Sequence, residues 1–293
     1  MQPANFNTVA LIGKYGDPEV KESVAHLMEM LVAEGVTVLV ERATAGELPT
    51  EAPHEPASLS AIGNRADLVI VVGGDGTLIG AARNLCEHEI PLVGVNLGRL
   101  GFLTETSLAN IQGSLEALLA GEYQVEERMM LRVRVQREAG DVAVERAFND
   151  VVVHRGSIAR MVEMETYVDG QFVFSQRSDG LIVASPTGST AYALSAGGPI
   201  VHPAMRAFTL VPVCPHTLTN RPILLPGHSH VEVVLTNNPG GVQLTLDGQT
   251  NFALADGDRI HIQRDDHNVH LLSDPRRNYF DVLREKFSWG ERV

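Results

Sequence analysis

The sequence predicts an α/β N-terminal domain with a parallel sheet, an all-β sandwich C-terminal domain, and a last helix that returns to the N-terminal domain. Three observations lead to this fold class. Short apolar runs alternate with helical spacings in the first third, apolar residues recur at every second position in the middle, and helical spacing returns after residue 278. We expect residues 1–103 together with 275–293 to form the α/β domain, and residues 104–274 to form the β-sandwich.

The first third has the pattern of a parallel sheet that is covered on both faces. Its apolar runs are continuous, as expected for strands buried on both sides. They lie at residues 8–12, 36–40, 68–72 and 92–95. Between them, Asp17-Pro18 begins a helix whose apolar positions recur every three or four residues up to Ala33, and a second helix is expected over residues 77–86. The segment 43–60 is rich in Ala, Pro, Glu and Ser and is expected to be a loop.

The middle of the chain has the pattern of antiparallel strands. Leu131, Val133 and Val135 alternate with polar residues, and Asp169-Gly170 lies between strand-like segments, which is a strong hairpin signal. Further strands are expected over residues 231–235, 242–246 and 259–263, separated by Gly- and Asp-rich turns. Two packed sheets would bury these alternating apolar faces. The last helix, around Tyr279 to Trp289, would use its aromatic residues for packing.

The composition excludes several classes of function. The net charge of −13 argues against a nucleic-acid or anionic-membrane surface, which needs a basic stripe. No apolar run approaches the roughly 18 residues of a membrane span, and the first residues lack the pattern of a signal peptide. The two cysteines, Cys86 and Cys214, are far apart and favour a reducing compartment, so we expect a cytoplasmic protein. The histidine spacings predict no metal site.

Gly73-Gly-Asp-Gly-Thr77 follows an apolar strand directly and leads into a helix. Glycines at such a position let a phosphate approach free backbone N–H groups at a helix N-terminus. The spacing matches neither the P-loop nor the dinucleotide-binding fingerprint, and Asp75 belongs to neither motif. A carboxylate there could bind a bridging metal ion, accept a proton from an attacking hydroxyl, or cap the following helix. The motif alone leaves these alternatives open.

Three more stretches carry candidate binding groups. Arg177-Ser-Asp-Gly180 precedes an apolar strand, and that strand leads into a hydroxyl-rich loop over residues 185–192 that ends in Tyr192. Such a loop can hydrogen-bond a polar ligand, and Tyr192 could stack on a base. Asn149-Asp150 precedes Val151-Val-Val153, and an Asn there can bind the amide or the ring edge of a base. For each stretch the alternative is an ordinary turn or loop.

Taken together, these motifs resemble the bacterial NAD kinase (ATP-NAD kinase) family over essentially the whole chain. The resemblance depends on seven segments in the family's order: residues 73–77, 96–103, 149–150, 177–180, 186–192, 196–199 and 246–249. The Gly-Gly-Asp-Gly-Thr run alone is weak, because diacylglycerol kinases, sphingosine kinases and phosphofructokinases carry similar runs. The complete set is specific. Asp150 stands where many members have Glu, which keeps the carboxylate.

The resemblance implies transfer of the γ-phosphate of ATP to the 2′-hydroxyl of the adenosine ribose of NAD, giving NADP. It implies Asp75 as the general base, a site between the two domains, a divalent cation (Mg²⁺ or Mn²⁺) that accompanies ATP, and a homo-oligomer, dimer or tetramer. It places the following residues in the substrate-binding site: Asp75, Gly76, Asn149, Asp150, Arg160, Arg177, Asp179, Thr187, Gly188, Ser189, Thr190, Ala191, Tyr192 and Gln249. Arg160 lies outside the strongest motifs.

Two alternatives accompany this hypothesis. A lipid kinase of the diacylglycerol type shares residues 73–77, but segments 186–192 and 246–249 and the lack of a basic or amphipathic membrane face disfavour it. A sensor that binds NAD or NADP without turnover is disfavoured by the intact Asp75. The sequence does not decide between ATP and polyphosphate as donor, or whether NADH is also accepted.

Overall fold

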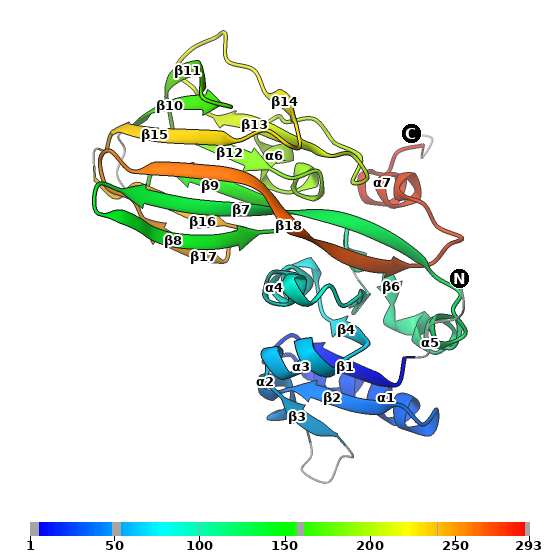
Figure 1. Cartoon of the computed structure of the whole chain (residues 1–293). Helices are drawn as coiled ribbons and strands as arrows, with labels where there is room; N and C mark the ends of the chain where they lie inside the picture. Colours follow the sequence, from blue (N-terminus) through cyan, green and yellow to red (C-terminus); the bar gives the residue numbers. More distant parts are fainter. Residues whose placement is uncertain (1–5, 49–53, 99, 157–160, 239, 291–293) are drawn as a thin grey trace. The chain divides into compact units, whose positions relative to one another are not determined.

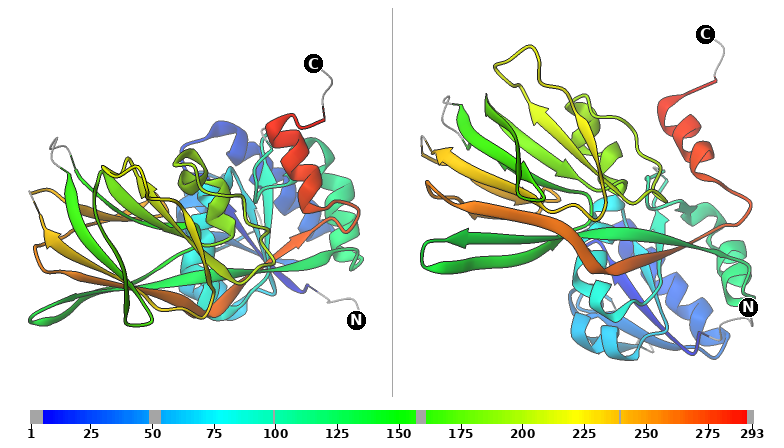
Figure 2. Two further views of the ribbon diagram at one scale, coloured as in Figure 1. Left: turned by 90° about the horizontal axis from the view of Figure 1, so that it is seen from above. Right: turned by 45° about the horizontal axis from the view of Figure 1, so that its top comes forward.

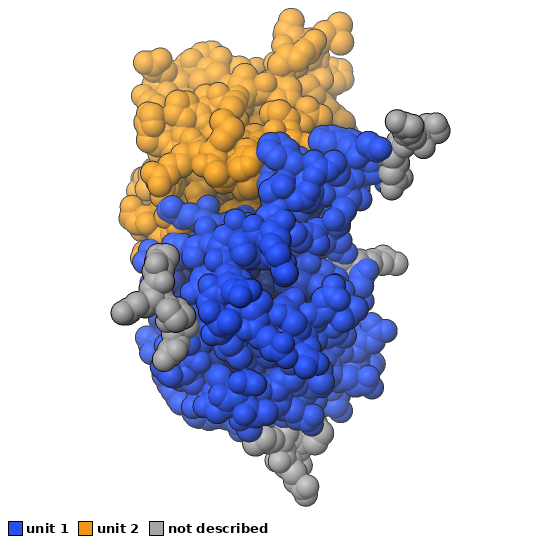
Figure 3. Space-filling view, turned by 90° about the vertical axis from the view of Figure 1, so that its right-hand side faces the viewer, with its two compact units in different colours: residues 1–127, 269–293 blue, residues 128–268 orange. Residues whose placement is uncertain are grey.

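The chain forms two compact units. The computed structural model describes residues 6–48, 54–98, 100–156, 161–238 and 240–290 (Figure 1). Unit 1 comprises residues 1–127 and 269–293, and unit 2 comprises residues 128–268; Figure 3 colours them separately. The last helix, α7 (Tyr279–Phe287), belongs to unit 1, as the sequence predicted.

The boundaries between the two units lie at different residues from those expected. The sequence predicted boundaries after residues 103 and 274, whereas the boundaries of the compact units lie after residues 127 and 268. The physical reason is α5 (Ile111–Leu119), which buries Ile111, Leu115 and Leu118 in the core of unit 1. Each unit boundary falls inside a strand, β7 (Gln124–Arg137) or β18 (Arg259–Ser273), and so neither boundary coincides with a loop.

Unit 1 contains the predicted parallel sheet. Its strands lie in the order β5 (Leu92–Asn96), β4 (Leu68–Val72), β1 (Thr8–Gly13), β2 (Thr37–Glu41) and β3 (Glu55–Ala57), all parallel. A short strand, β6 (Thr106–Ser107), and the end of β18 pair with β5. Every residue of β4 and β5 is buried, which explains their continuous apolar runs.

Helices cover both faces of this sheet, because successive strand side chains point to opposite sides. Alternate strand residues such as Val9, Leu11 and Ile70 share one core with α1 (Pro18–Ala33) and α5. On the other face lie α3 (Leu59–Arg65) and α4 (Asp75–Leu85), which pack on β2, β4 and β5. The N-terminus of α4 therefore follows the carboxyl end of a central buried strand, where open α/β sheets bind ligands.

Unit 2 is the predicted antiparallel sandwich, and Figure 2 shows its strands from two further directions. One sheet contains β11 (Gln171–Ser178), β10 (Val162–Val168), β15 (Val231–Asn237) and β18, with β7 and β8 (Gly140–Ala147) beside β18. The other has the order β14 (Ile223–Pro226), β13 (Ala207–Val213), β12 (Gly180–Ala184), β9 (Asp150–His154), β16 (Gln243–Leu246) and β17 (Thr250–Ala253). One buried apolar cluster joins residues of both sheets, among them Val133, Val153, Leu181 and Val233.

One expectation about elements was wrong, and one expected strand is present but longer. The segment 43–60 is not simply a loop: it contains most of α2 (Arg42–Ala45), β3 and the start of α3. Among the described strands, β3 pairs with β2 alone at the sheet edge and therefore tolerates Pro56, and this pairing has no local sequence signal. The strand expected over 259–263 continues to Ser273, because it pairs with β15 and then with β5.

Among the described residues, no helix is both long and apolar enough to cross a membrane.

Candidate active site

In unit 1, the candidate site lies where β4 ends and α4 begins. Gly74 is the N-cap of α4 and Asp75 is its first residue, so the Asp75 side chain does not cap the helix. Its carboxylate instead accepts hydrogen bonds from the loop after β5. Oδ2 accepts from the Phe102 N–H at 2.8 Å, and Oδ1 accepts from the N–H groups of Leu103 and Thr104 and from the Thr104 hydroxyl, each at 3.1 Å.

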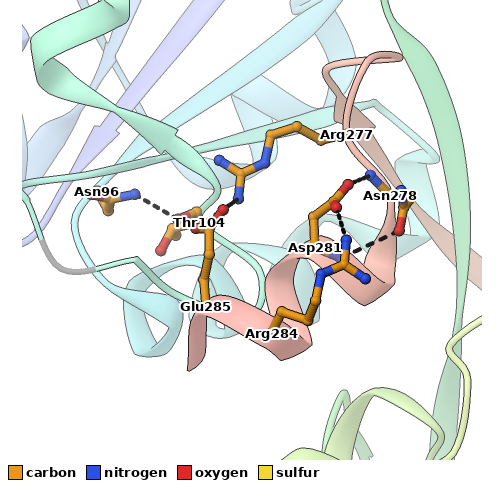
Figure 4. Close-up of polar contacts among 7 residues, drawn as sticks. All are labelled: Asn96, Thr104, Arg277, Asn278, Asp281, Arg284 and Glu285. Carbon is orange, nitrogen blue, oxygen red and sulfur yellow. Dashed lines mark hydrogen bonds and ion pairs between the residues drawn. The ribbon is translucent and has the colours of Figure 1, made fainter. Parts of the chain in front are cut away.

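The loop that surrounds Asp75 is held from two sides. The buried Asn96 amide donates to the Thr104 carbonyl at 2.7 Å, as Figure 4 shows, while its oxygen accepts from the Gly98 N–H. Gly101 leaves no room for a side chain, because a Cβ at this position would overlap Asp75 Oδ1 and the Thr104 hydroxyl. The glycines of the segment 96–103 thus let the backbone close around the carboxylate.

The C-terminal helix contacts the same loop. The Phe287 ring lies 5.8 Å from the Phe102 ring, and the Lys286 ammonium lies 5.4 Å from that ring's centre. A capping box at Asn278 and Asp281 fixes the start of the helix (Figure 4). These contacts confirm that the helix uses an aromatic residue for packing, although Phe280 and Trp289 are half exposed.

In unit 2, the candidate site is a cavity of about 620 Å³ over one face of β9, whose alternate residues Asp150, Val152 and His154 line it. It is lined by Asn149, Asp150, Asp179, Ala191 and Tyr192 of the predicted set, and also by Val152, His154, Arg155, Gly156, Val213, Cys214, Thr245, Asp247 and Gly248. Its volume lies within the ordinary range for small-molecule sites.

Two buried polar atoms of the predicted set, both in unit 2, have no hydrogen-bond partner among the residues that the structure describes. They are Asn149 Oδ1 and the Thr187 hydroxyl. Buried polar groups in native structures are almost always paired, so these two are candidates for contact with a ligand. Arg155 and Asp179, which face the same cavity, form an ion pair with Nε and Oδ1 3.1 Å apart.

Asp150 is a buried carboxyl group beside a second carboxylate. Burial, and then the negative charge of Asp247, raise its pKa to about 7, although the Tyr192 N–H donates to it and opposes the shift. Near neutral pH the group is therefore present in both protonated and ionised forms. A carboxyl in that state can donate or accept a hydrogen bond toward a bound nucleotide.

The remaining predicted residues have varied positions. Gly76 lies in the first turn of α4. Arg177, on β11, is exposed and pairs with Glu163, and Gln249 lies in the turn between β16 and β17. Thr187 to Thr190 form a short 3₁₀ turn before α6 (Tyr192–Ser195), and Arg160 lies outside the described residues.

Within the 3₁₀ turn, Gly188 and Ser189 also make contacts that hold the turn. The Ser189 hydroxyl is fully buried, donates to the Pro186 carbonyl and accepts from the Val201 N–H. A Cβ on Gly188 would overlap the Asn149 carbonyl, so Gly188 allows the turn to approach the Asn149 backbone. Asp75 and Gly76 belong to unit 1, and the other described members of the set belong to unit 2.

The sequence reasoning missed five polar residues of the cavity: His154, Arg155, Cys214, Thr245 and Asp247. His154 and Arg155 follow the apolar strand that begins at Asp150, so the end of that strand was a usable signal. Asp247 belongs to the motif 246–249, from which only Gln249 was predicted as a site residue. Cys214 and Thr245 had no local signal.

The fold and these two regions define the class: a two-domain nucleotide-binding protein with a glycine-rich turn in an α/β domain and a polar cavity in a β-sandwich. Comparison with known proteins gives the family. Residues 9–123 match the ATP-NAD kinase N-terminal domain, and residues 148–273 match the ATP-NAD kinase C-terminal domain. The chain belongs to the ATP-NAD kinase family.

Individual relatives agree with this assignment. The chain is 48% identical to an NAD kinase of Magnetococcus marinus over 98% of this chain and 95% of that protein. It is 46% identical to an NAD kinase of Geobacter sulfurreducens over 97% and 99% of the two chains.

Solved structures are similar as well. Yeast NADH kinase complexed with NADH has a TM-score of 0.90 at 26% identity and covers 99% of this chain and 89% of its own. An NAD kinase from Archaeoglobus fulgidus in complex with ATP has a TM-score of 0.74 at 28% identity, and the match covers 94% of this chain and 98% of that chain.

Proposed function

We propose that the protein transfers the γ-phosphoryl group of ATP to the 2′-hydroxyl of the adenosine ribose of NAD and so forms NADP. Membership of the ATP-NAD kinase family over both domains is the observation that carries this proposal. The cavity of unit 2 supports it, because Asn149, which lines the cavity, has a buried Oδ1 available to a polar ligand. The proposed NAD-contacting residues are those of the predicted set, Arg160 included.

In this proposal Asp75 is the general base and acts through Oδ2. Within the described part of the chain, Oδ1 accepts three hydrogen bonds and Oδ2 accepts one, from Phe102, so Oδ2 has more lone-pair capacity left for a further donor. A ribose hydroxyl within about 3 Å of Oδ2 could therefore donate to it. Phosphoryl transfer has a loose transition state, so Asp75 needs to orient the hydroxyl and take its proton late.

We further propose that the divalent cation enters as the complex with ATP. Among the described residues, no group of three or more His, Cys, Asp or Glu side chains is arranged to hold a metal ion. Mg²⁺ is commonly bound through substrate phosphates with few protein ligands, which suits such a site. Its chemistry would be to neutralise charge on the transferred phosphoryl group. We infer that the enzyme works in the cytoplasm, as a homo-oligomer.

The first test is direct turnover. The purified protein is incubated with NAD, ATP and Mg²⁺, and NADP is measured with an NADP-specific dehydrogenase. Formation of NADP supports the proposal, and tight NAD binding without NADP would favour the sensor. The same assay with polyphosphate or NADH identifies the donor and the acceptor.

A second test separates a base from a residue that only holds the loop. Asp75→Asn removes the proton acceptor and also disturbs the loop. Thr104→Val removes one donor to Oδ1 and leaves the carboxylate in place. If Asp75 is the base, Asp75→Asn should lower kcat by about 10²–10⁴-fold, whereas Thr104→Val should lower it only a few-fold. Equal losses in the two variants would show that Asp75 acts by holding the loop.

A further inference from the structure

Asp247 makes an unusual set of contacts with the segment Phe148–Asp150. Its Oδ1 accepts from the N–H groups of Phe148, Asn149 and Asp150 at 3.1, 2.7 and 3.1 Å, and its Oδ2 also accepts from the Phe148 N–H at 2.9 Å. Three consecutive N–H groups directed at one anion form a strong, charge-assisted arrangement. The two partners are nearly a hundred positions apart in the chain.

The same segment is held on its carbonyl side. The Phe148 carbonyl accepts from the Ser185 hydroxyl at 2.6 Å, the Asn149 carbonyl accepts from the Ser185 N–H at 2.8 Å, and the Asp150 carbonyl accepts from the Asp247 N–H at 3.0 Å. Two residues, Ser185 and Asp247, therefore satisfy all six backbone polar groups of the segment. Asp247 supplies four of the six partners.

The segment that Asp247 holds carries two side chains of the cavity. Asn149 Oδ1 is buried and has no partner in the described part of the chain, and the neighbouring Asp150 carboxyl is also buried. A side chain directed at a ligand is effective only if its backbone is fixed, because displacements of about 1 Å at a binding site are costly. The position of the Asn149 amide thus depends on the Asp247 carboxylate.

We propose that Asp247 is a positioning residue for NAD: its carboxylate fixes the backbone of residues 148–150 and thereby aims Asn149 and Asp150 at the nucleotide. This inference rests on the proposed function. Asp247 acts through its neighbours and is not assigned a chemical step. The negative charge it brings also disfavours ionisation of Asp150, in the same direction as burial does.

The turn geometry makes a clean variant possible. Asp247 has a φ of 52° and is followed by Gly248 at 65°, so Asp247→Gly removes the carboxylate without backbone strain. Asp169 is the matched control: it has a φ of 51°, is followed by Gly170 at 77°, and accepts a single N–H, from His230. Asp169→Gly makes the same backbone change in a hairpin of the other sheet of unit 2.

The experiment measures NAD binding by calorimetry and the KM values for NAD and ATP. We expect Asp247→Gly to raise the Kd and KM for NAD at least tenfold and to leave the KM for ATP within about twofold of wild type. Asp169→Gly should bind NAD as wild type does. Asp247→Asn should bind NAD more tightly than Asp247→Gly but less tightly than wild type, because its amide oxygen can still accept at the Oδ1 position whereas its NH2 group cannot accept the Phe148 N–H at the Oδ2 position.

Asp247→Glu is the second variant in case Asp247→Gly does not fold. It keeps the charge but moves the carboxylate by one methylene group, and it should also raise the Kd for NAD at least tenfold. Wild-type affinity for NAD in folded Asp247→Gly, or in Asp247→Glu, would overturn the inference. If wild type binds NAD but forms no NADP, the proposed function fails while the positioning role is still tested by Kd.

Discussion

The Asp150→Asn substitution tests the energetic consequence of burying a carboxyl group beside Asp247. Its folded-state pKa is about 7, raised from 3.8 first by burial and then by the charge of Asp247. In the unfolded chain the group recovers its ordinary pKa. Asn has nearly the same shape, and its amide oxygen can still accept from the Tyr192 N–H, so the variant removes the ionisation and little else.

The sign follows from proton uptake. Between the two pKa values the folded protein keeps a proton that the unfolded chain has lost, so wild-type stability falls as the pH rises. This contribution is fully present below about pH 4 and is lost by about pH 8. A shift from 3.8 to about 7 is roughly three units, and at 1.36 kcal/mol per unit the wild type loses up to about 4 kcal/mol relative to the variant.

The assay is urea unfolding of wild type and Asp150→Asn, followed by circular dichroism at several pH values from about 5 to 8. We expect the difference in unfolding free energy to grow in favour of the variant by about 1 kcal/mol or more per pH unit up to about pH 7. Asp169→Asn, which changes an exposed carboxylate, should keep the wild-type dependence.

A difference that stays constant over this range would refute the reasoning. Asp247→Asn gives an independent check on the two causes. Because burial is the larger cause and the Asp247 charge the smaller, removing that charge should reduce the pH dependence without abolishing it.

Three further predictions concern other parts of the chain. Asp75→Asn should lose most turnover while NAD binding persists in calorimetry; kcat near the wild-type value would show that Asp75 is not the base. Gly101→Ala should lower kcat at least tenfold with little change in the Tm of unit 2, because its Cβ would overlap Asp75 Oδ1, and full activity would contradict that packing. Asp258→Asn should destabilise unit 2 by about 1.5–3 kcal/mol in urea unfolding, since the buried Asp258 carboxylate binds the partly exposed Arg137 guanidinium through two oxygens; a loss below about 0.5 kcal/mol would contradict this.

The sequence determined the elements whose signals are local. The buried runs of β1, β4 and β5, the helix that begins after Asp17, and the Asp169-Gly170 hairpin follow from periodicity, capping and turn chemistry. The same signals defined the two-domain fold class, and the set of motifs was specific enough to indicate the family. Short edge elements such as β3 were not predicted, because their stability depends on pairing with a neighbouring strand and not on their own residues.

Only the tertiary structure decided what the carboxylates of Asp75 and Asp247 contact. The motif around Asp75 left a helix cap, a metal ligand and a base open, and the folded chain replaces the cap with a loop 27 to 29 positions away. Asp247 reads as an ordinary turn residue, yet it binds three N–H groups 97 to 99 positions away. Such contacts depend on which segments come together within each folded unit, and no local spacing in the chain encodes that.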